Sequence, residues 1–267
     1  MKIPFTKAHG AKNDFLLTWD SDAEGVDLPE MARAICDRHT GIGADGWLIV
    51  ARSTQSGVQG SIRLFNADGS EAEISGNGTR CAAAFLIEAG LAEREVSILT
   101  GAGVKHLRVI HRNGWRYGFE MNMGRPAIDT QQVRYTLPLR DKPVDCTIVN
   151  VGNPQCAVFV KDFSFDWRTI GAEIEGHSYF PKRTNVSFVR VVDDHTIDVR
   201  FFERGVGETM SSGTGSTGAA AAALARGEVS APVQIQTPAG VLSLRRDGSD
   251  LYLIGPAEII AKGEFSL

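Results

Sequence analysis

The chain contains the same segment twice, and this internal repeat constrains the fold more than any other feature. Residues 63–108 and 200–245 align without a gap at a spacing of 137 residues, and 18 of the 46 paired positions are identical. A repeat of this length predicts two homologous halves rather than an array of small repeats. The identical pairs include Phe65 with Phe202, Glu71 with Glu208, Ser75 with Ser212, Gly76 with Gly213 and Gly78 with Gly215.

Each half combines short β-rich runs with one helix that is rich in alanine. The clearest strand patterns lie at residues 47–50, 61–65, 147–151, 185–191 and 196–202. Helical patterns cover 29–38, 79–89 and 216–226, and the last two end at Gly90 and Gly227, which suit a C-terminal cap. Because 216–225 carries no charge, we expect that helix to be buried rather than exposed.

These patterns predict an α/β (α+β) fold of two pseudosymmetric domains, residues 1–124 and 125–267. Each domain is expected to be a barrel-like β-sheet around a central helix, with the C-terminal strand free to return to the first half. If the halves pack about a pseudo-twofold axis, the two repeated loops face one cleft, and we expect the active site there. Such a site suits a reaction that needs one catalytic group on each side of a substrate atom.

Composition excludes several classes of function. A formal net charge of −4 and scattered basic residues argue against nucleic-acid binding. No apolar run approaches bilayer length and the N-terminus lacks a signal-peptide pattern, so we expect no membrane association and a cytoplasmic location. The four cysteines have irregular spacings, which favours buried thiols over a disulfide framework or a zinc site.

Two glycine-rich loops, Ser75–Gly78 and Ser212–Gly215, each stand before a predicted helix. Glycines there leave backbone N–H groups free, and the helix dipole favours a negative ligand. Such a loop binds a carboxylate as well as a phosphate. Neither loop matches G-x-x-x-x-G-K-[ST], which disfavours a nucleotide phosphate site.

Several polar residues could complement an amino acid held at these loops. An asparagine in such a turn is more often a turn residue than a ligand. Arg204 could bind a carboxylate and Glu203 an ammonium group, although the pair could equally be a solvated pair of charges at a strand end. The candidates are Asn13, Asn66, Asn153, Asn185, Glu203 and Arg204.

The combination of motifs resembles the diaminopimelate epimerase family of cofactor-independent amino-acid epimerases. The resemblance rests on HGAKNDF (9–15), TGIGADG (40–46), FNADGSEAE-x-x-GNGTRC (65–81), VGNP (151–154), RTNV (183–186) and ERGVGET-x-x-x-GTG (203–215). It implies inversion of one α-carbon of diaminopimelate, as in lysine and peptidoglycan synthesis, and a homodimer that binds a small amino-acid substrate without metal or other cofactor. The implied substrate-binding residues are Asn13, Asn66, Gly76, Asn77, Asn153, Asn185, Glu203, Arg204, Gly213 and Thr214.

This chain departs from the family pattern at three catalytic positions. The family has a cysteine before each glycine loop, where this chain has Ser75 and Ser212, and usually a histidine where this chain has Gln155. The family's partner for the second cysteine corresponds to Glu203, which is retained. Generating an alkoxide near neutral pH costs roughly 7–10 kcal/mol, against about 2 kcal/mol or less for a thiolate. Gln155 cannot titrate, so the two-thiol mechanism does not apply unchanged.

Four hypotheses therefore follow for the expected site, whose catalytic candidates are Ser75, Ser212, Glu203 and Gln155. The first is an α-carbon epimerase. The second is a related dehydratase or lyase of a hydroxy-amino acid, in which Glu203 is the single base. The third is a pseudoenzyme that binds an amino acid without turnover. The fourth is a protein whose two cysteines were deliberately replaced by serine, against which Gln155 argues, because trapping would not require a third change.

Overall fold

The internal repeat corresponds to a pair of β-α-β crossovers in the computed structural model, which describes residues 2–72 and 74–266. In the first copy, β4 (Gly60–Asn66) leads through β5 (Glu71–Ala72) and α2 (Gly76–Glu88) to β6 (Glu95–Thr100), which pairs in parallel with β4. In the second, β13 (Thr196–Glu203) leads through β14 (Gly207–Thr209) and α4 (Gly213–Arg226) to β15 (Val233–Thr237), parallel to β13.

The strand registers of the two copies coincide residue by residue. Phe65 pairs with Glu71, and Phe202 pairs with Glu208. Ser61 pairs with Leu99, and Asp198 pairs with Gln236. The paired positions of the two copies differ by 137 in residue number, as in the sequence repeat. The two copies therefore share their strand pairing as well as their sequence.

The chain divides into two units, Met1–Met121 with Gly255–Leu267, and Asn122–Ile254. Residues 255–267 group with the first unit. The sequence patterns allowed for such a return of the C-terminal strand to the first half. Strand β17 (Asp250–Ser266) therefore contributes its first residues to the second unit and the rest to the first.

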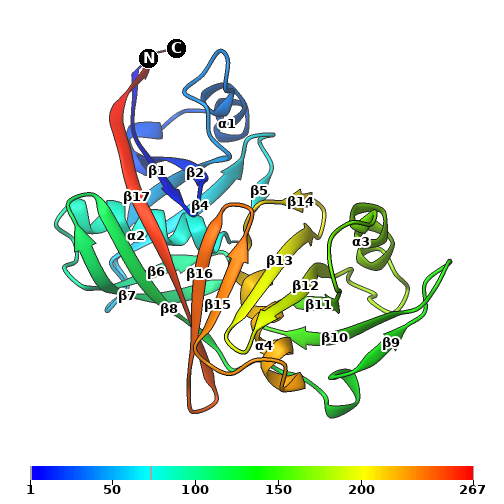
Figure 1. Cartoon of the computed structure of the whole chain (residues 1–267). Coiled ribbons are helices and arrows are strands. Elements are labelled where there is room, and N and C mark those ends of the chain that lie inside the picture. The colour runs from blue at the N-terminus through cyan, green and yellow to red at the C-terminus, as the bar shows by residue number, and fades with distance from the viewer. Residues whose placement is uncertain (1, 73, 267) are drawn as a thin grey trace. The chain divides into compact units, whose positions relative to one another are not determined.

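The first unit is a closed barrel around α2 (Figure 1). Its strands pair in the order β17, β1, β2, β3, β4, β6, β7, β8 and again β17. Helix α1 (Leu28–Cys36) covers the outside near β3 and β4, after the 3-10 turn Asp20–Ala23. The remaining strands are β1 (Lys2–Gly10), β2 (Asn13–Trp19), β3 (Gly46–Arg52), β7 (Gly103–Asn113) and β8 (Arg116–Gly124).

The second unit repeats this plan around α4, with pairing in the order β9, β10, β11, β12, β13, β15, β16 and the start of β17. Helix α3 (Trp167–Glu175) packs on β12 and β13 and was not predicted from the sequence. The remaining elements are the 3-10 turn Thr130–Gln132, β9 (Tyr135–Leu137), β10 (Val144–Asn150), β11 (Pro154–Phe159), β12 (Asn185–Asp193) and β16 (Gly240–Asp247). The predicted α/β architecture, with one central helix in each half, is confirmed.

Alanine allows both central helices to be enclosed by sheet. Residues 82–84 of α2 and 219–223 of α4 are buried, and each helix contacts at least five strands of its own unit. Gly227 ends α4 in the left-handed conformation, with φ of 71°, as a C-terminal cap requires. The predicted starts at residues 79 and 216 were three residues late, because the glycines of both loops belong to the first helical turn. Their low helix propensity concealed this in the sequence.

A buried arginine fastens the last turn of α4 to the sheet of the second unit. The Arg226 side chain is 1% exposed and binds both carboxylate oxygens of Asp145 at 2.7 and 2.8 Å. It also donates to Thr147 Oγ1 at 2.8 Å and to the Val133 carbonyl at 3.1 Å, and its guanidinium lies 3.9 Å from the Phe159 ring centroid. The cation is thus paired on every side.

Replacing Arg226 with methionine should lower the free energy of unfolding by about 2–4 kcal/mol, because buried acceptors lose their donor. Chemical denaturation followed by circular dichroism measures this change. Arg134→Met is the matched control, since Arg134 also binds Glu228 at this end of α4 but its side chain is 58% exposed. That variant should lose less than about 1 kcal/mol. Equal losses in the two variants would contradict the assigned role of Arg226.

Candidate active site

Serine is the N-cap of each central helix, at the two positions that the repeat singled out. Ser75 Oγ accepts a hydrogen bond from the Gly78 N–H at 3.1 Å, and Ser212 Oγ accepts one from the Gly215 N–H at 3.0 Å. A Cβ on Gly215 would lie 2.9 Å from Ser212 Oγ, so only glycine fits beside the capping hydroxyl. Each hydroxyl oxygen accepts one hydrogen bond in the cap, and its O–H group can still donate to another partner.

An asparagine from a neighbouring turn supports each loop within its own unit. In the first unit, Asn77 Nδ2 donates to Asn13 Oδ1 at 3.2 Å, and Asn13 Nδ2 donates to Asp45 at 2.7 Å. In the second, Asn153 Nδ2 donates to Thr214 Oγ1 at 3.3 Å. Asn77 and Thr214 are paired positions of the repeat, so the two loops are held by corresponding contacts.

Gln155 is a buried support for Asn153. Its Nε2 donates to Asn153 Oδ1 at 2.8 Å, its side chain is enclosed, and its Oε1 has no hydrogen-bond partner. Helix α4 approaches it closely, since a Cβ on Gly218 would lie 2.9 Å from Gln155 Cγ. Gln155 can therefore orient Asn153, but it has no proton to give or take at neutral pH.

Glu203 lies at the end of β13 and has the chemistry of a general base. Desolvation raises its pKa, and the nearby hydroxyls of Ser212 and Thr209 partly oppose this rise by stabilising the carboxylate. Thr209 Oγ1 itself has no hydrogen-bond partner of good geometry. A carboxyl with a raised pKa beside the Ser212 hydroxyl is an arrangement suited to proton transfer.

Asn185 joins the VGNP segment to the start of the ERGVGET segment. Its Nδ2 donates to the Pro154 carbonyl at 3.2 Å, and its Oδ1 accepts the Arg204 backbone N–H at 3.0 Å. The exposed Arg204 guanidinium bonds the Lys182 carbonyl at 3.1 Å. No carboxylate partner of Arg204 occurs among residues 2–72 and 74–266. The Arg204 guanidinium is consequently available to bind an acidic ligand.

The structure gathers the predicted residues within each unit, with one exception. Asn153, Gln155, Asn185, Glu203, Arg204, Ser212 and Thr214 form one connected set in the second unit. Asn13, Ser75 and Asn77 surround the start of α2 in the first. Asn66 instead forms a turn, donating from Nδ2 to Ser70 Oγ at 2.9 Å.

Two polar residues of these sets were missed at the sequence level. Arg80 is completely buried and bonds Asn77, and Thr209 lies beside Glu203. A charged residue directly before the apolar run 81–87 of an alanine-rich helix was a signal for Arg80. For Thr209 no comparable signal exists, because it becomes relevant only through the β13–β14 turn.

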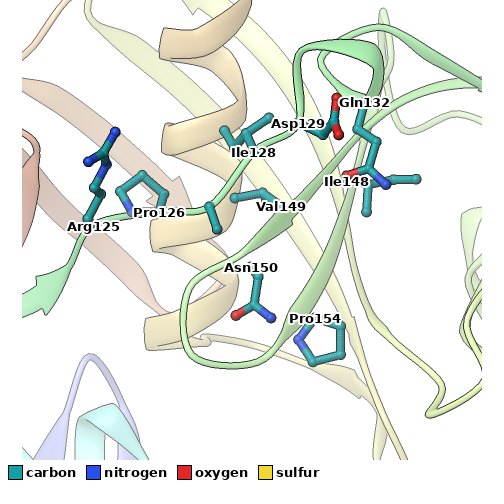
Figure 2. Close-up of a pocket in the computed structure, with 10 residues that line it drawn as sticks. Arg125, Pro126, Ile128, Asp129, Gln132, Ile148, Val149, Asn150 and Pro154 are labelled. Atoms are coloured by element: carbon teal, nitrogen blue, oxygen red, sulfur yellow. The ribbon is translucent and has the colours of Figure 1, made fainter.

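A shallow pocket of about 640 Å³ lies in the second unit (Figure 2). It is bounded by residues 125–129, Gln132, residues 148–150 and Pro154. Pro154 belongs to the VGNP segment, but none of the predicted site residues lines this pocket. The candidate catalytic residues are therefore identified from the loops rather than from this pocket.

Two structural searches bear on the predicted absences. Across residues 2–72 and 74–266, no group of three or more His, Cys, Asp or Glu residues could hold a metal ion. Over the same residues, no helix is long and apolar enough to span a membrane. The four cysteines are buried and unpaired.

The family model and the curated relatives agree on one family. The model for diaminopimelate epimerase matches residues 5–128 and 147–260. The diaminopimelate epimerase of Moorella thermoacetica is 39% identical, covering 98% of this chain and 99% of that protein. The enzyme of Pelotomaculum thermopropionicum is 38% identical, covering 98% of each.

A solved structure shows the same fold at low sequence identity. A hydroxyproline epimerase from Agrobacterium vitis with bound trans-4-hydroxy-L-proline superposes with a TM-score of 0.71 at 13% identity, covering 98% of this chain and 90% of that one. The match of the family model and the full-length relatives together show that this chain belongs to the diaminopimelate epimerase family.

Proposed function

We propose that this protein inverts the α-carbon of diaminopimelate between the LL and meso forms without a cofactor. Its full-length relatives bear the name of that activity, and the two capped loops supply N–H groups suited to a carboxylate. The observation that carries the proposal is the Glu203 carboxyl, whose pKa is raised beside the Ser212 hydroxyl.

The serines require a proton relay rather than a free alkoxide. As the α-C–H bond breaks, Ser212 Oγ accepts that proton while its own proton passes to Glu203, so no separate charge remains on the serine. The electron pair stays on the α-carbon and spreads into the substrate carboxylate. Backbone N–H groups at residues 76–77 and 213–214 are proposed to stabilise the added negative charge.

Inversion then needs a proton from the opposite face, and the proposal assigns this step to Ser75. The Ser75 hydroxyl gives its proton to the α-carbon while a water molecule protonates Ser75 Oγ, and the hydroxide so formed is neutralised through solvent by the proton that Glu203 took up. No titratable side chain bonds Ser75 among the described residues. We therefore expect this half-reaction to be slow and the turnover to lie below that of thiol-containing relatives.

The direct test incubates purified protein with LL- and meso-diaminopimelate in deuterated buffer. We expect α-deuteration by NMR together with interconversion of the two stereoisomers. Glu203→Gln is the control and should abolish both. Binding without exchange would refute the proposal in favour of a pseudoenzyme. Loss of water from hydroxy-amino acids such as hydroxyprolines, with no inversion, would refute it in favour of the dehydratase.

We also propose that the active protein is a homodimer, as the resemblance to the family implies. Exposed apolar side chains on the first unit are compatible with a partner surface, among them Ile110, Trp115 and Ile260. Sedimentation equilibrium tests this assignment. A single species with the mass of one chain at micromolar concentration would contradict it.

Restoring cysteine at positions 75 and 212 should accelerate the reaction. A thiolate forms at several kcal/mol less than an alkoxide, so the Ser75→Cys, Ser212→Cys double variant should invert diaminopimelate at least about a hundredfold faster. The single variants are the controls, and each should speed exchange of only one stereoisomer. An unchanged rate in the double variant would show that proton transfer at these positions does not limit turnover.

Glu203→Gln should stabilise the folded protein at alkaline pH while removing activity. The pKa of Glu203 is raised in the folded state, so the folded protein loses stability relative to the unfolded chain as pH rises through that pKa. A neutral isostere avoids this loss. Urea denaturation at pH 8 and at pH 4 measures the difference, which should be positive at pH 8 and vanish toward pH 4. Glu208→Gln, at an exposed carboxylate on β14, should not reproduce this pattern.

A further inference from the structure

Arg80 is a buried cation that the protein does not neutralise. The residue lies in the first turns of α2 and is 0% exposed. Its Nε donates to the Pro256 carbonyl at 3.0 Å and its Nη2 to Asn77 Oδ1, while Nη1 has no partner. Across residues 2–72 and 74–266, no carboxylate pairs with Arg80.

The nearest carboxylate in this network is reached through two amides and is already paired. Asn77 bonds Asn13, and Asn13 bonds Asp45. Asp45 in turn receives Arg38 Nη2 at 2.9 Å. Its charge is therefore shared with another cation and cannot serve as the counter-ion of Arg80.

A buried arginine without an acid is unusual within this chain. Arg226, the other arginine with a fully enclosed side chain, binds both oxygens of Asp145 and two further acceptors. An uncompensated buried charge is costly, and ion pairing normally offsets that cost. Desolvation lowers the pKa of Arg80 to about 10, so the guanidinium still carries its charge at neutral pH.

The repeat shows that this cation is not a requirement of the fold. Position 80 corresponds to Thr217 in the second copy. Thr217 is also buried, and its hydroxyl simply bonds the Gly213 carbonyl at 2.9 Å within its own helix. The second copy has Glu203 where the first has Asn66. The first unit thus has a buried cation in its central helix where the second has a neutral hydroxyl.

We propose that Arg80 is a positioning residue. It holds Asn77 in place and makes the electrostatic potential at the first loop positive, so that a ligand carboxylate bound at this loop supplies the counter-charge that Arg80 lacks. Asn77 connects the two, because its Oδ1 accepts from Arg80 and its backbone belongs to the loop. The inference rests on the proposed function for the identity of the carboxylate. It adds a buried cation behind the first of the two loops that are proposed to hold this carboxylate.

The test compares Arg80→Met and Arg80→Lys with the unaltered protein and with Arg226→Met. Melting temperatures are measured without ligand, with sodium acetate against sodium chloride at equal ionic strength, and with diaminopimelate. The doubly decarboxylated analogue, 1,5-diaminopentane, is the amine-only control. Affinities are taken from isothermal titration calorimetry.

Arg80→Met loses the hydrogen bonds to the Pro256 carbonyl and to Asn77 Oδ1. It also removes a buried charge that has no counter-ion, and this gain should offset the loss, so that the empty protein is at least as stable as before. We therefore expect Arg80→Met to melt at the same temperature or higher, yet to bind diaminopimelate about tenfold or more weakly. Arg80→Lys should retain most of the affinity because it retains the charge. The diamine should bind all variants alike, and Arg226→Met should lose stability without losing carboxylate selectivity.

Several outcomes would overturn the proposal. They are a fall in melting temperature or failure to fold for Arg80→Met, an unchanged affinity in that variant, or an equal loss of affinity in Arg80→Lys. If diaminopimelate does not bind but acetate stabilises the unaltered protein more than Arg80→Met, the substrate assignment fails and the role of Arg80 stands. If diaminopimelate is inverted and Arg80→Met leaves KM unchanged, the function stands and this inference fails.

Discussion

The enclosure of a nearly chargeless helix by a curved sheet is the constraint from which the rest of each unit follows. A helix surrounded on all sides needs small side chains, which the alanines of α2 and α4 provide. Its first N–H groups cannot be left without partners in such surroundings. A serine hydroxyl satisfies one of them in each unit. The same geometry that completes the fold thereby gives each unit a loop of the kind to which anions bind.

The two copies of this solution differ in charge. The first loop is backed by Arg80, and the second is flanked by Glu203 with Arg204 beside it. Gln155 and Asn153 stiffen the second loop without titrating, so the proposed acid–base chemistry there depends on Glu203 and the serine beside it.

Much of this arrangement was accessible from the sequence, for identifiable physical reasons. The repeat established the correspondence of Ser75 with Ser212 and predicted two homologous halves. Alanine content predicted the burial of both helices. The start of each helix was misjudged, because Gly76, Gly78, Gly213 and Gly215 have low helix propensity and only a surrounding sheet makes that conformation favourable. The functional roles of the named residues remain proposals.

What the sequence could not supply depends on contacts between distant segments. Helix α3 was missed because its short amphipathic pattern gains stability only against β12 and β13. Asn66 stabilises a turn, whereas Asn153 supports the second loop. The sequence does not distinguish these roles, because both asparagines stand in similar local contexts. The unpaired state of Arg80 is also invisible in sequence, since it is defined by the absence of a neighbour in three dimensions.

Strand β17 has a consequence for how the protein is made. Residues 255–266 close the barrel of the first unit between β1 and β8, yet the whole of the second unit precedes them in the chain. During translation the first unit must therefore wait with an open seam until the ribosome has synthesised the second. Chaperones that shield exposed strand edges would find their substrate in that waiting intermediate, with β1 and β8 as the edges to be protected.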